Sequence, residues 1–76
     1  MIRAYVAVIT AGGASKEVLD AVRDLSGVTE AHIVAGDFDI VAEIEGETVH
    51  DLQTMLTKEI QAIDGVGTTR TYVQLD

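Results

Sequence analysis

The chain has no cysteine, no proline and no tryptophan, and it has only one phenylalanine and two tyrosines among 76 residues. Without cysteine there is neither a disulfide framework nor thiolate chemistry, which fits a reducing compartment. No segment reaches the length of a transmembrane helix, and the first residues alternate like a strand rather than forming the apolar block of a signal peptide. We therefore expect a cytoplasmic protein with no membrane association.

Basic residues are also scarce. Five lysines and arginines stand against thirteen acidic residues, for a formal charge of −8. Phosphate backbones are bound by clustered cations, and the five here are scattered along the chain. We expect no direct binding of nucleic acid, and the acidic balance fits ordinary solubility or a salty cytoplasm.

Hydrophobic residues are plentiful, at 47% of the chain, and their spacing changes along it. Short β-rich runs predict strands over residues 2–10, 28–35, 38–45 and 66–75, with Gly36-Asp37 as a tight hairpin turn. The intervening segments have apolar residues at helical spacing, which predicts a βαββαβ order. The two stripes are Val18, Leu19, Val22 and Leu25, and Val49, Leu52, Met55, Leu56, Ile60 and Ile63.

The expected helix ends follow from local chemistry. Ser15 is a candidate N-cap for the first helix, and Gly27 a candidate residue just beyond its end. Thr48 is the candidate N-cap of the second helix, because Asp51 stands three residues later in capping-box position. Gly65 is expected to end that helix.

An internal repeat supports this order. Shifting the sequence by half its length places Leu25-Ser26-Gly27-Val28 on Ile63-Asp64-Gly65-Val66. Two β-α-β units of this kind predict a single α+β domain over residues 1–76 with a ferredoxin-like fold. Two helices would cover one face of a four-stranded antiparallel sheet.

The second face of that sheet is expected to be apolar as well. In the first strand Val6 and Val8 point one way, while Tyr5, Ala7 and Ile9 point the other. In the second strand, Val28 and Val34 are expected to oppose Ala31, Ile33 and Ala35. A face without helices that is nonetheless apolar needs another cover, and a second copy of the chain is the simplest one.

Candidate chemistry is sparse. Asp37 fits turn chemistry, whereas Asp39 stands at a strand start and is either an edge-strand carboxylate or an acceptor for an ammonium group. His32 and His50 have no metal-ligand spacing, and no nucleophile elbow or phosphate loop is present. The residue pattern therefore supports neither an enzyme nor a metal or cofactor site. Thr68, Thr69, Arg70 and Thr71 form either a polar cluster or simply a β-prone run.

Four motifs in order resemble the effector domain of the Lrp/AsnC family, the feast/famine transcription regulators that sense amino acids. They are an A-Y-V first strand, an L-x-G-V helix exit, a V-x-G-D-[FY]-D hairpin and I-x-G-V-x-x-T-x-T at the end. The resemblance runs along the whole chain. It implies a domain that dimerises through its sheet, rings of dimers such as octamers, and a small amino acid bound between dimers.

The resemblance also implies where the amino acid binds. The family's ligand contacts fall on Gly36, Asp37, Phe38 and Asp39 of the hairpin, and on Thr69, Thr71, Tyr72 and Val73 of the last strand. Turn amides suit an α-carboxylate, and Asp39 with threonine hydroxyls suits an ammonium or polar side chain.

Family members usually carry a helix-turn-helix, whereas this chain starts at the first strand. The expected role is therefore that of a stand-alone sensing module, with a full-length regulator as a possible partner. A structural oligomerisation partner with a degenerate pocket is the alternative, and a small enzyme on the same fold is a third reading. The residues do not identify the amino acid, the size of the oligomer or the partner regulator.

Overall fold

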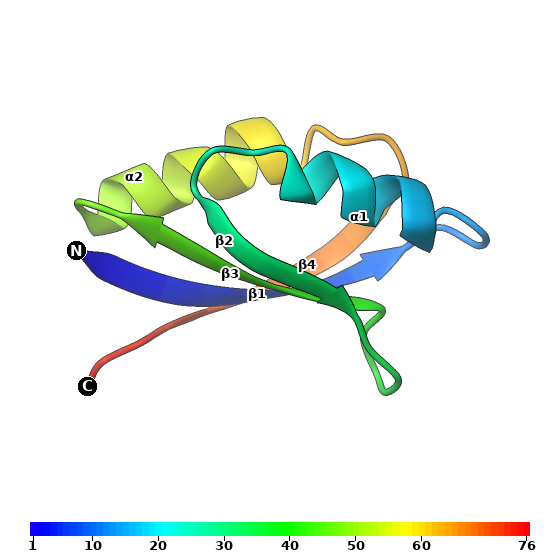
Figure 1. The fold of residues 1–76 in the computed structure, drawn as a ribbon, viewed down its shortest axis with the longest axis horizontal. Helices are drawn as coiled ribbons and strands as arrows, with labels where there is room; N and C mark the ends of the chain where they lie inside the picture. Colours follow the sequence, from blue (N-terminus) through cyan, green and yellow to red (C-terminus); the bar gives the residue numbers. More distant parts are fainter.

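The computed structural model describes all of residues 1–76 as a four-stranded antiparallel sheet with its helices on one face (Figure 1). The strand order is β2-β3-β1-β4. The ferredoxin-like α+β fold expected from the sequence is confirmed. None of the helices has the length and apolar character needed to cross a membrane. The elements are β1 (Ile2–Thr10), α1 (Ser15–Arg23), β2 (Val28–Ile33), β3 (Ile40–Gly46), α2 (Val49–Thr54), the π-helical η1 (Met55–Ile60) and β4 (Val66–Val73).

The core lies between the sheet and the helices. Alternation along the two central strands turns every second apolar side chain toward the helices, which cover them with their own apolar stripes. Removal of this apolar surface from water is the main favourable contribution to folding. The largest fully buried side chains are Val6 and Val8 of β1, Ile40 and Ile44 of β3, Val18 and Val22 of α1, and Ile60 of η1.

The second helix begins as the sequence indicates. Thr48 Oγ1 accepts a hydrogen bond from the Asp51 amide at 3.1 Å, and Asp51 Oδ2 accepts one from the Thr48 amide at 3.2 Å. This reciprocal pair is a capping box. From Met55 the helix widens into a π turn, marked by the hydrogen bond from Gln61 N–H to the Leu56 carbonyl at 2.9 Å.

Both predicted ends of the first helix are wrong. The N-cap is Ala14, without a side-chain bond, and Ser15 is the first helical residue. Its hydroxyl instead lies 2.7 Å from Thr10 Oγ1. The helix ends at Arg23, before Gly27, which has another role. A Cβ on Gly27 would lie 1.9 Å from Met55 Cε, so glycine there makes room for the side chain from η1.

An irregular register in β2 changes which side chains share a face. Val28 pairs with Ile44 and Ala31 with Ala42, and the register shifts between them at Thr29 and Glu30. An extra residue of this kind reverses the alternation. Val28 therefore lies on the helix side with Ala31, and the prediction that the two oppose each other is wrong.

Candidate functional site

The loop between β2 and β3 is longer than the two-residue turn that Gly36-Asp37 suggested. Its ends are joined by the hydrogen bond from Val34 N–H to the Asp39 carbonyl at 2.8 Å, which leaves residues 35–38 as the tip. Gly36 has a φ of 157°, and no other group lies within 4 Å of the Cβ it lacks. Residues with a side chain rarely adopt this backbone conformation, which is a physical reason for glycine at this position.

The two aspartates of the hairpin have different surroundings. Asp37 is exposed at the tip, and Asp39 is half-buried at the start of β3. Asp39 Oδ2 accepts two hydrogen bonds from Thr10, one from the amide at 2.8 Å and one from the hydroxyl at 3.2 Å. The Asp39 amide also donates to the Val8 carbonyl at 2.9 Å. Asp39 is therefore fastened to β1, and its second oxygen, Oδ1, makes no hydrogen bond within the chain.

The strand-side residues of the predicted site divide between the two faces of the sheet. Val8 pairs with Thr69, Val6 with Thr71 and Ala4 with Val73, so these three residues lie on the helix side. Thr69 Oγ1 accepts a hydrogen bond from Gln61 Nε2 at 2.9 Å. Thr71 and Val73 line a groove of about 220 Å³ against α2, with Val49, Leu52, Gln53 and Leu56. Tyr72 pairs with Tyr5 and lies on the opposite, open face.

The eight predicted residues do not meet in a single pocket of one chain. Thr69 lies at the hairpin end of the sheet, because Val8 pairs with both Thr69 and Ile40. Thr69 is nevertheless about 10 Å, two strand spacings, from β3. Val73 pairs with Ala4 and lies farther along β4, toward the other end of the sheet. No pocket of the single chain is lined by both the hairpin residues and the β4 residues.

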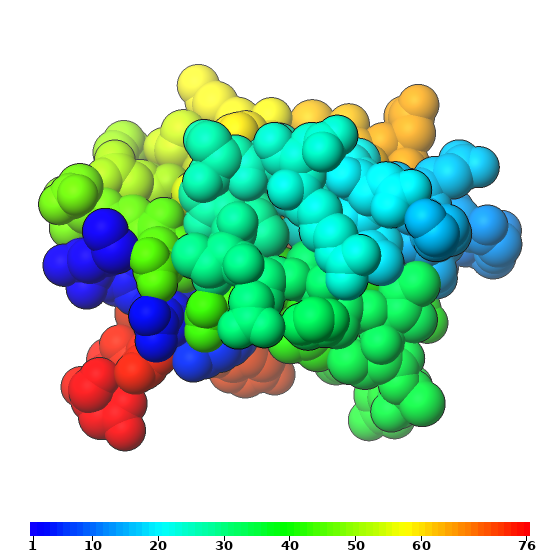
Figure 2. Space-filling model, viewed as in Figure 1, coloured from blue at the N-terminus to red at the C-terminus, as the bar shows by residue number.

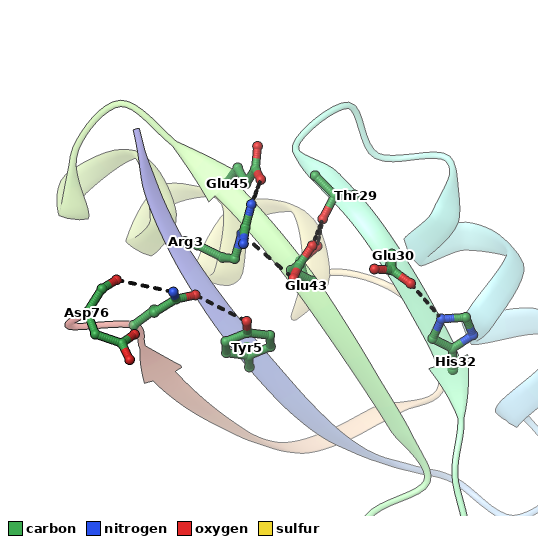
Figure 3. Close-up of polar contacts among 9 residues, drawn as sticks. Arg3, Tyr5, Thr29, Glu30, His32, Glu43, Glu45 and Asp76 are labelled. Carbon is green, nitrogen blue, oxygen red and sulfur yellow. Dashed lines mark hydrogen bonds and ion pairs between the residues drawn. The ribbon is translucent and has the colours of Figure 1, made fainter.

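The open face of the sheet is mixed rather than uniformly apolar. Its apolar part follows β1 and includes Val34 beyond β2. Strands β2 and β3 carry acidic side chains on this face, which the sequence pattern did not predict (Figure 3). A depression of about 320 Å³ lies between the two parts. Apolar side chains on this face are Tyr5, Ala7, Ile9, Val34 and Val41, and Tyr72 adds a ring at the margin.

Ion pairs offset part of the acidic charge on this face. Arg3 Nη2 lies 2.8 Å from Glu45 Oε1, and Arg3 Nε lies 3.7 Å from Glu43 Oε1 (Figure 3). The hydrogen bond to Glu45, followed by the charge of Glu43, raises the pKa of Arg3 above its usual value. Thr29 Oγ1 donates to Glu43 Oε2 at 2.6 Å. Glu43 and Glu45 are therefore each bound by a side chain from a neighbouring strand.

The histidines do not converge on a metal site. His32 Nε2 lies 3.2 Å from Glu30 Oε1 on the open face, and His50 is exposed on α2. No three His, Asp or Glu side chains gather closely enough to hold a metal ion.

Sequence reasoning missed three polar residues near the predicted site. Thr10 lies beside Asp39, Ser15 lies beside Thr10, and Gln61 donates to the hydroxyl of Thr69. Thr10 is a polar residue at the end of the otherwise apolar second half of β1, which is the signal that could have drawn attention to it. No sequence pattern marks Gln61, because its reach to β4 depends on the π turn.

Comparison with known proteins identifies relatives. The sequence profile of the Lrp/AsnC ligand binding domain matches residues 3–76. An uncharacterized HTH-type transcriptional regulator of Pyrococcus furiosus is 34% identical over 62 residues, which are 82% of this chain and 41% of the relative. The chain thus spans less than half the length of that regulator.

Solved structures share the fold over nearly the whole chain. A protein of Thermus thermophilus has a TM-score of 0.96 at 29% identity, with 100% of this chain and 95% of that chain covered. AsnC of E. coli has a TM-score of 0.93 at 25% identity, with 99% and 51% covered. A transcriptional regulator of Neisseria meningitidis, solved as a complex with L-Met, has a TM-score of 0.89 at 14% identity, with 99% and 50% covered. This last likeness shows the fold alone.

Proposed function

The chain belongs to the Lrp/AsnC ligand binding domain family, and we propose that it is a regulatory module that binds a small amino acid between copies of itself. The proposed contacts are Gly36, Asp37, Phe38 and Asp39 of one copy with Thr69, Thr71, Tyr72 and Val73 of another. In this proposal the protein performs no chemical reaction on the amino acid.

The position of the hairpin carries the proposal. The hairpin projects beyond the sheet on the side away from the helices, and so does the C-terminal tail (Figures 1 and 2). The two projections flank the open face. In this proposal a copy seated on that face meets the hairpin and Tyr72. Thr69, Thr71 and Val73 lie on the helix side of the sheet, so the hairpin that reaches them comes from a copy in a neighbouring dimer.

The hairpin offers the groups that a zwitterion needs. The backbone N–H groups of the exposed tip are donors for an α-carboxylate, as successive amides in turns commonly are. Asp39 Oδ1 is free within the chain and can accept from the α-ammonium group while Oδ2 stays bound to Thr10. Hydroxyls of Thr69 and Thr71 are left for the ligand's side chain.

The open face suits a second copy of the chain. Tyr5, Ala7 and Val41 supply an apolar centre, and Arg3 and the glutamates beside it supply polar groups toward the edge. An apolar centre with a polar rim is the usual anatomy of a protein interface. We propose a homodimer through this face, with dimers associating further into a ring.

The proposed regulatory role follows the relatives, which are named as transcriptional regulators. These 76 residues carry a charge of −8 without a cationic cluster, so we propose that the domain itself does not contact DNA. A longer family member that co-assembles with it would make that contact. The place of action in this proposal is the cytoplasm.

Thermal melts with each of the twenty L-amino acids, followed by calorimetry on those that raise the melting temperature, test the proposal. L-methionine is one of the panel, since the Neisseria regulator was solved with L-Met. Saturable binding by at least one amino acid is expected. Absence of binding by all twenty, with an oligomeric mass in light scattering, would favour a purely structural oligomerisation partner.

A further inference from the structure

The end of β1 contains a backbone donor that the sheet does not satisfy. On the β3 side, the β1 ladder ends at the pair Val8 and Ile40. Beyond it the Thr10 amide has no strand carbonyl opposite, and Asp39 Oδ2 accepts its hydrogen bond at 2.8 Å. A side-chain carboxylate thus takes the place of a backbone acceptor, because a partly buried N–H group without a partner is costly.

Two hydroxyls extend this contact to the first helix. The Thr10 hydroxyl donates its single hydrogen to the Asp39 carboxylate. In the 2.7 Å contact between Thr10 Oγ1 and Ser15 Oγ, Ser15 must then be the donor. The order Ser15 to Thr10 to Asp39 connects the first residue of α1, the last residue of β1 and the hairpin. We name these three residues the clasp.

We propose that Thr10 and Ser15 are positioning residues for the amino-acid site and that they act through Asp39. The inference rests on the proposed function, because it assigns the hairpin to ligand binding. The clasp orients the Asp39 carboxylate so that Oδ2 faces Thr10 and Oδ1 is presented to the ligand. It also fixes the base of the four-residue tip.

The location of the clasp distinguishes a role in positioning Asp39 from a general contribution to the stability of the fold. All three residues are half-buried at the end of the sheet, outside the group of buried side chains that forms the core. The tip has no other polar side-chain contact to the body of the chain. Weakening the clasp therefore leaves the core in place, and it releases the one polar side-chain tether of the hairpin.

The test compares two substitutions at one position. Thr10→Val removes the hydroxyl, keeps the shape and keeps the amide, whereas Thr10→Ser keeps the hydroxyl. Thr57→Val is the matched control, because Thr57 on η1 donates its hydroxyl to the Gln53 carbonyl, remote from the hairpin. Each variant is titrated with the L-amino acid that gives the largest shift for the wild type. Hydrogen exchange of the Asp37, Phe38 and Asp39 amides is measured without any amino acid.

Thr10→Val is expected to lower affinity roughly three- to tenfold, the effect of one hydrogen bond, and to speed exchange at the three hairpin amides. Thr10→Ser should restore both, and Thr57→Val should change neither. If Thr10→Val proves too unstable to titrate, Ser15→Ala removes the outer link of the clasp, and a smaller loss of affinity is expected.

Unchanged exchange in Thr10→Val would overturn the clasp even where no amino acid binds. Failure of the wild type to bind any amino acid would overturn the proposed function, and the exchange rates would then test the clasp alone. Faster exchange with unchanged affinity would show that the clasp holds the hairpin but does not position ligand, and the inference would be wrong.

Discussion

Asp37 and Asp39 stand two residues apart in one hairpin, yet the structure gives them different tasks. Asp37 is exposed at the tip, while Asp39 is bound to β1 through its amide and one carboxylate oxygen. Sequence could identify both as hairpin residues and single out Asp39 as the less turn-like. It could not identify Thr10 as the partner, because the pairing of β1 with β3 joins residues distant in sequence.

Replacement of each aspartate by asparagine tests the proposed ammonium contact. In Asp39→Asn, the amide oxygen can keep the bonds to Thr10, but the NH₂ group then stands where Oδ1 would accept from the ligand. A charge-assisted hydrogen bond is worth about 1.5–3 kcal/mol, so affinity should fall about tenfold or more. Asp37→Asn should lose less, because asparagine serves a turn about as well.

Calorimetry with the best-binding amino acid measures both variants, and a thermal melt of each shows whether the fold persists. Equal losses for the two variants would rule out a special role for Asp39, as would an unchanged affinity of Asp39→Asn.

Thr48→Ala tests the capping box at the start of α2. The change removes the acceptor of the Asp51 amide, and the loss of an N-cap side chain costs about 1 kcal/mol of unfolding free energy. For a domain of this size that lowers the melting temperature by roughly 4–8 °C. Thr48→Ser keeps the hydroxyl and is the control, which should melt close to the wild type. If Thr48→Ala melts within about 1 °C of Thr48→Ser, well below the expected shift, the assignment of Thr48 as a stabilising N-cap is wrong.

At the scale of elements, periodicity predicted the order and the strands well but failed where regular geometry is broken. The first strand matches its predicted bounds, and Thr48 caps as expected. The extra residue in β2 and the π turn were missed, because both insert one residue without altering the local apolar pattern. Gly27 was misread as a helix end because its actual role, making room for Met55, depends on packing between distant segments.

The π turn predicts that one residue can be removed from η1. Met55 and Ile60 are both buried although they are five residues apart, which suits the wider π turn. Deletion of Thr57, which is exposed, would leave them four apart, the spacing that shares a face in an α-helix. The variant should therefore fold with about wild-type stability and an uninterrupted α-helix.

Deletion of Asp20 is the matched control for this prediction. It would rotate Val22 of α1 by about 100° out of the core, a loss comparable to emptying a buried aliphatic site at about 2–5 kcal/mol. Circular dichroism and urea unfolding of both deletions give the comparison. If the Thr57 deletion is as destabilising as the Asp20 deletion, the widened turn is not a removable insertion.

At the scale of the whole molecule, the sequence indicated that the second face of the sheet needs a cover. The structure shows which part of that face is apolar. The apolar part of the open face follows β1, with Val34 beyond β2. The carboxylates of β3, Glu43 and Glu45, are bound by Arg3 and Thr29, and Glu30 of β2 lies beside His32. Composition and alternation identified Tyr5, Ala7 and Ile9. They could not identify Glu30 and His32 of β2 as part of this face, because the irregular register of β2 decides which of its side chains point outward.

Tyr5→Glu tests whether this face joins two copies. Tyr5 lies opposite Glu43 in the sheet register, and its side chain points away from the core. The substitution should leave the fold intact, as circular dichroism would show, but it places a second carboxylate beside Glu43. In a dimer through this face both carboxylates would be desolvated and would lie against the same carboxylates of the other copy, which costs several kcal/mol. Light scattering should then show a smaller multiple of the 8.1 kDa chain than for the wild type. Ala62→Glu, which adds the same charge at an exposed position beyond η1, should keep the wild-type mass. A folded Tyr5→Glu variant that keeps the wild-type mass would place the interface between copies elsewhere, and with it the proposed amino-acid site.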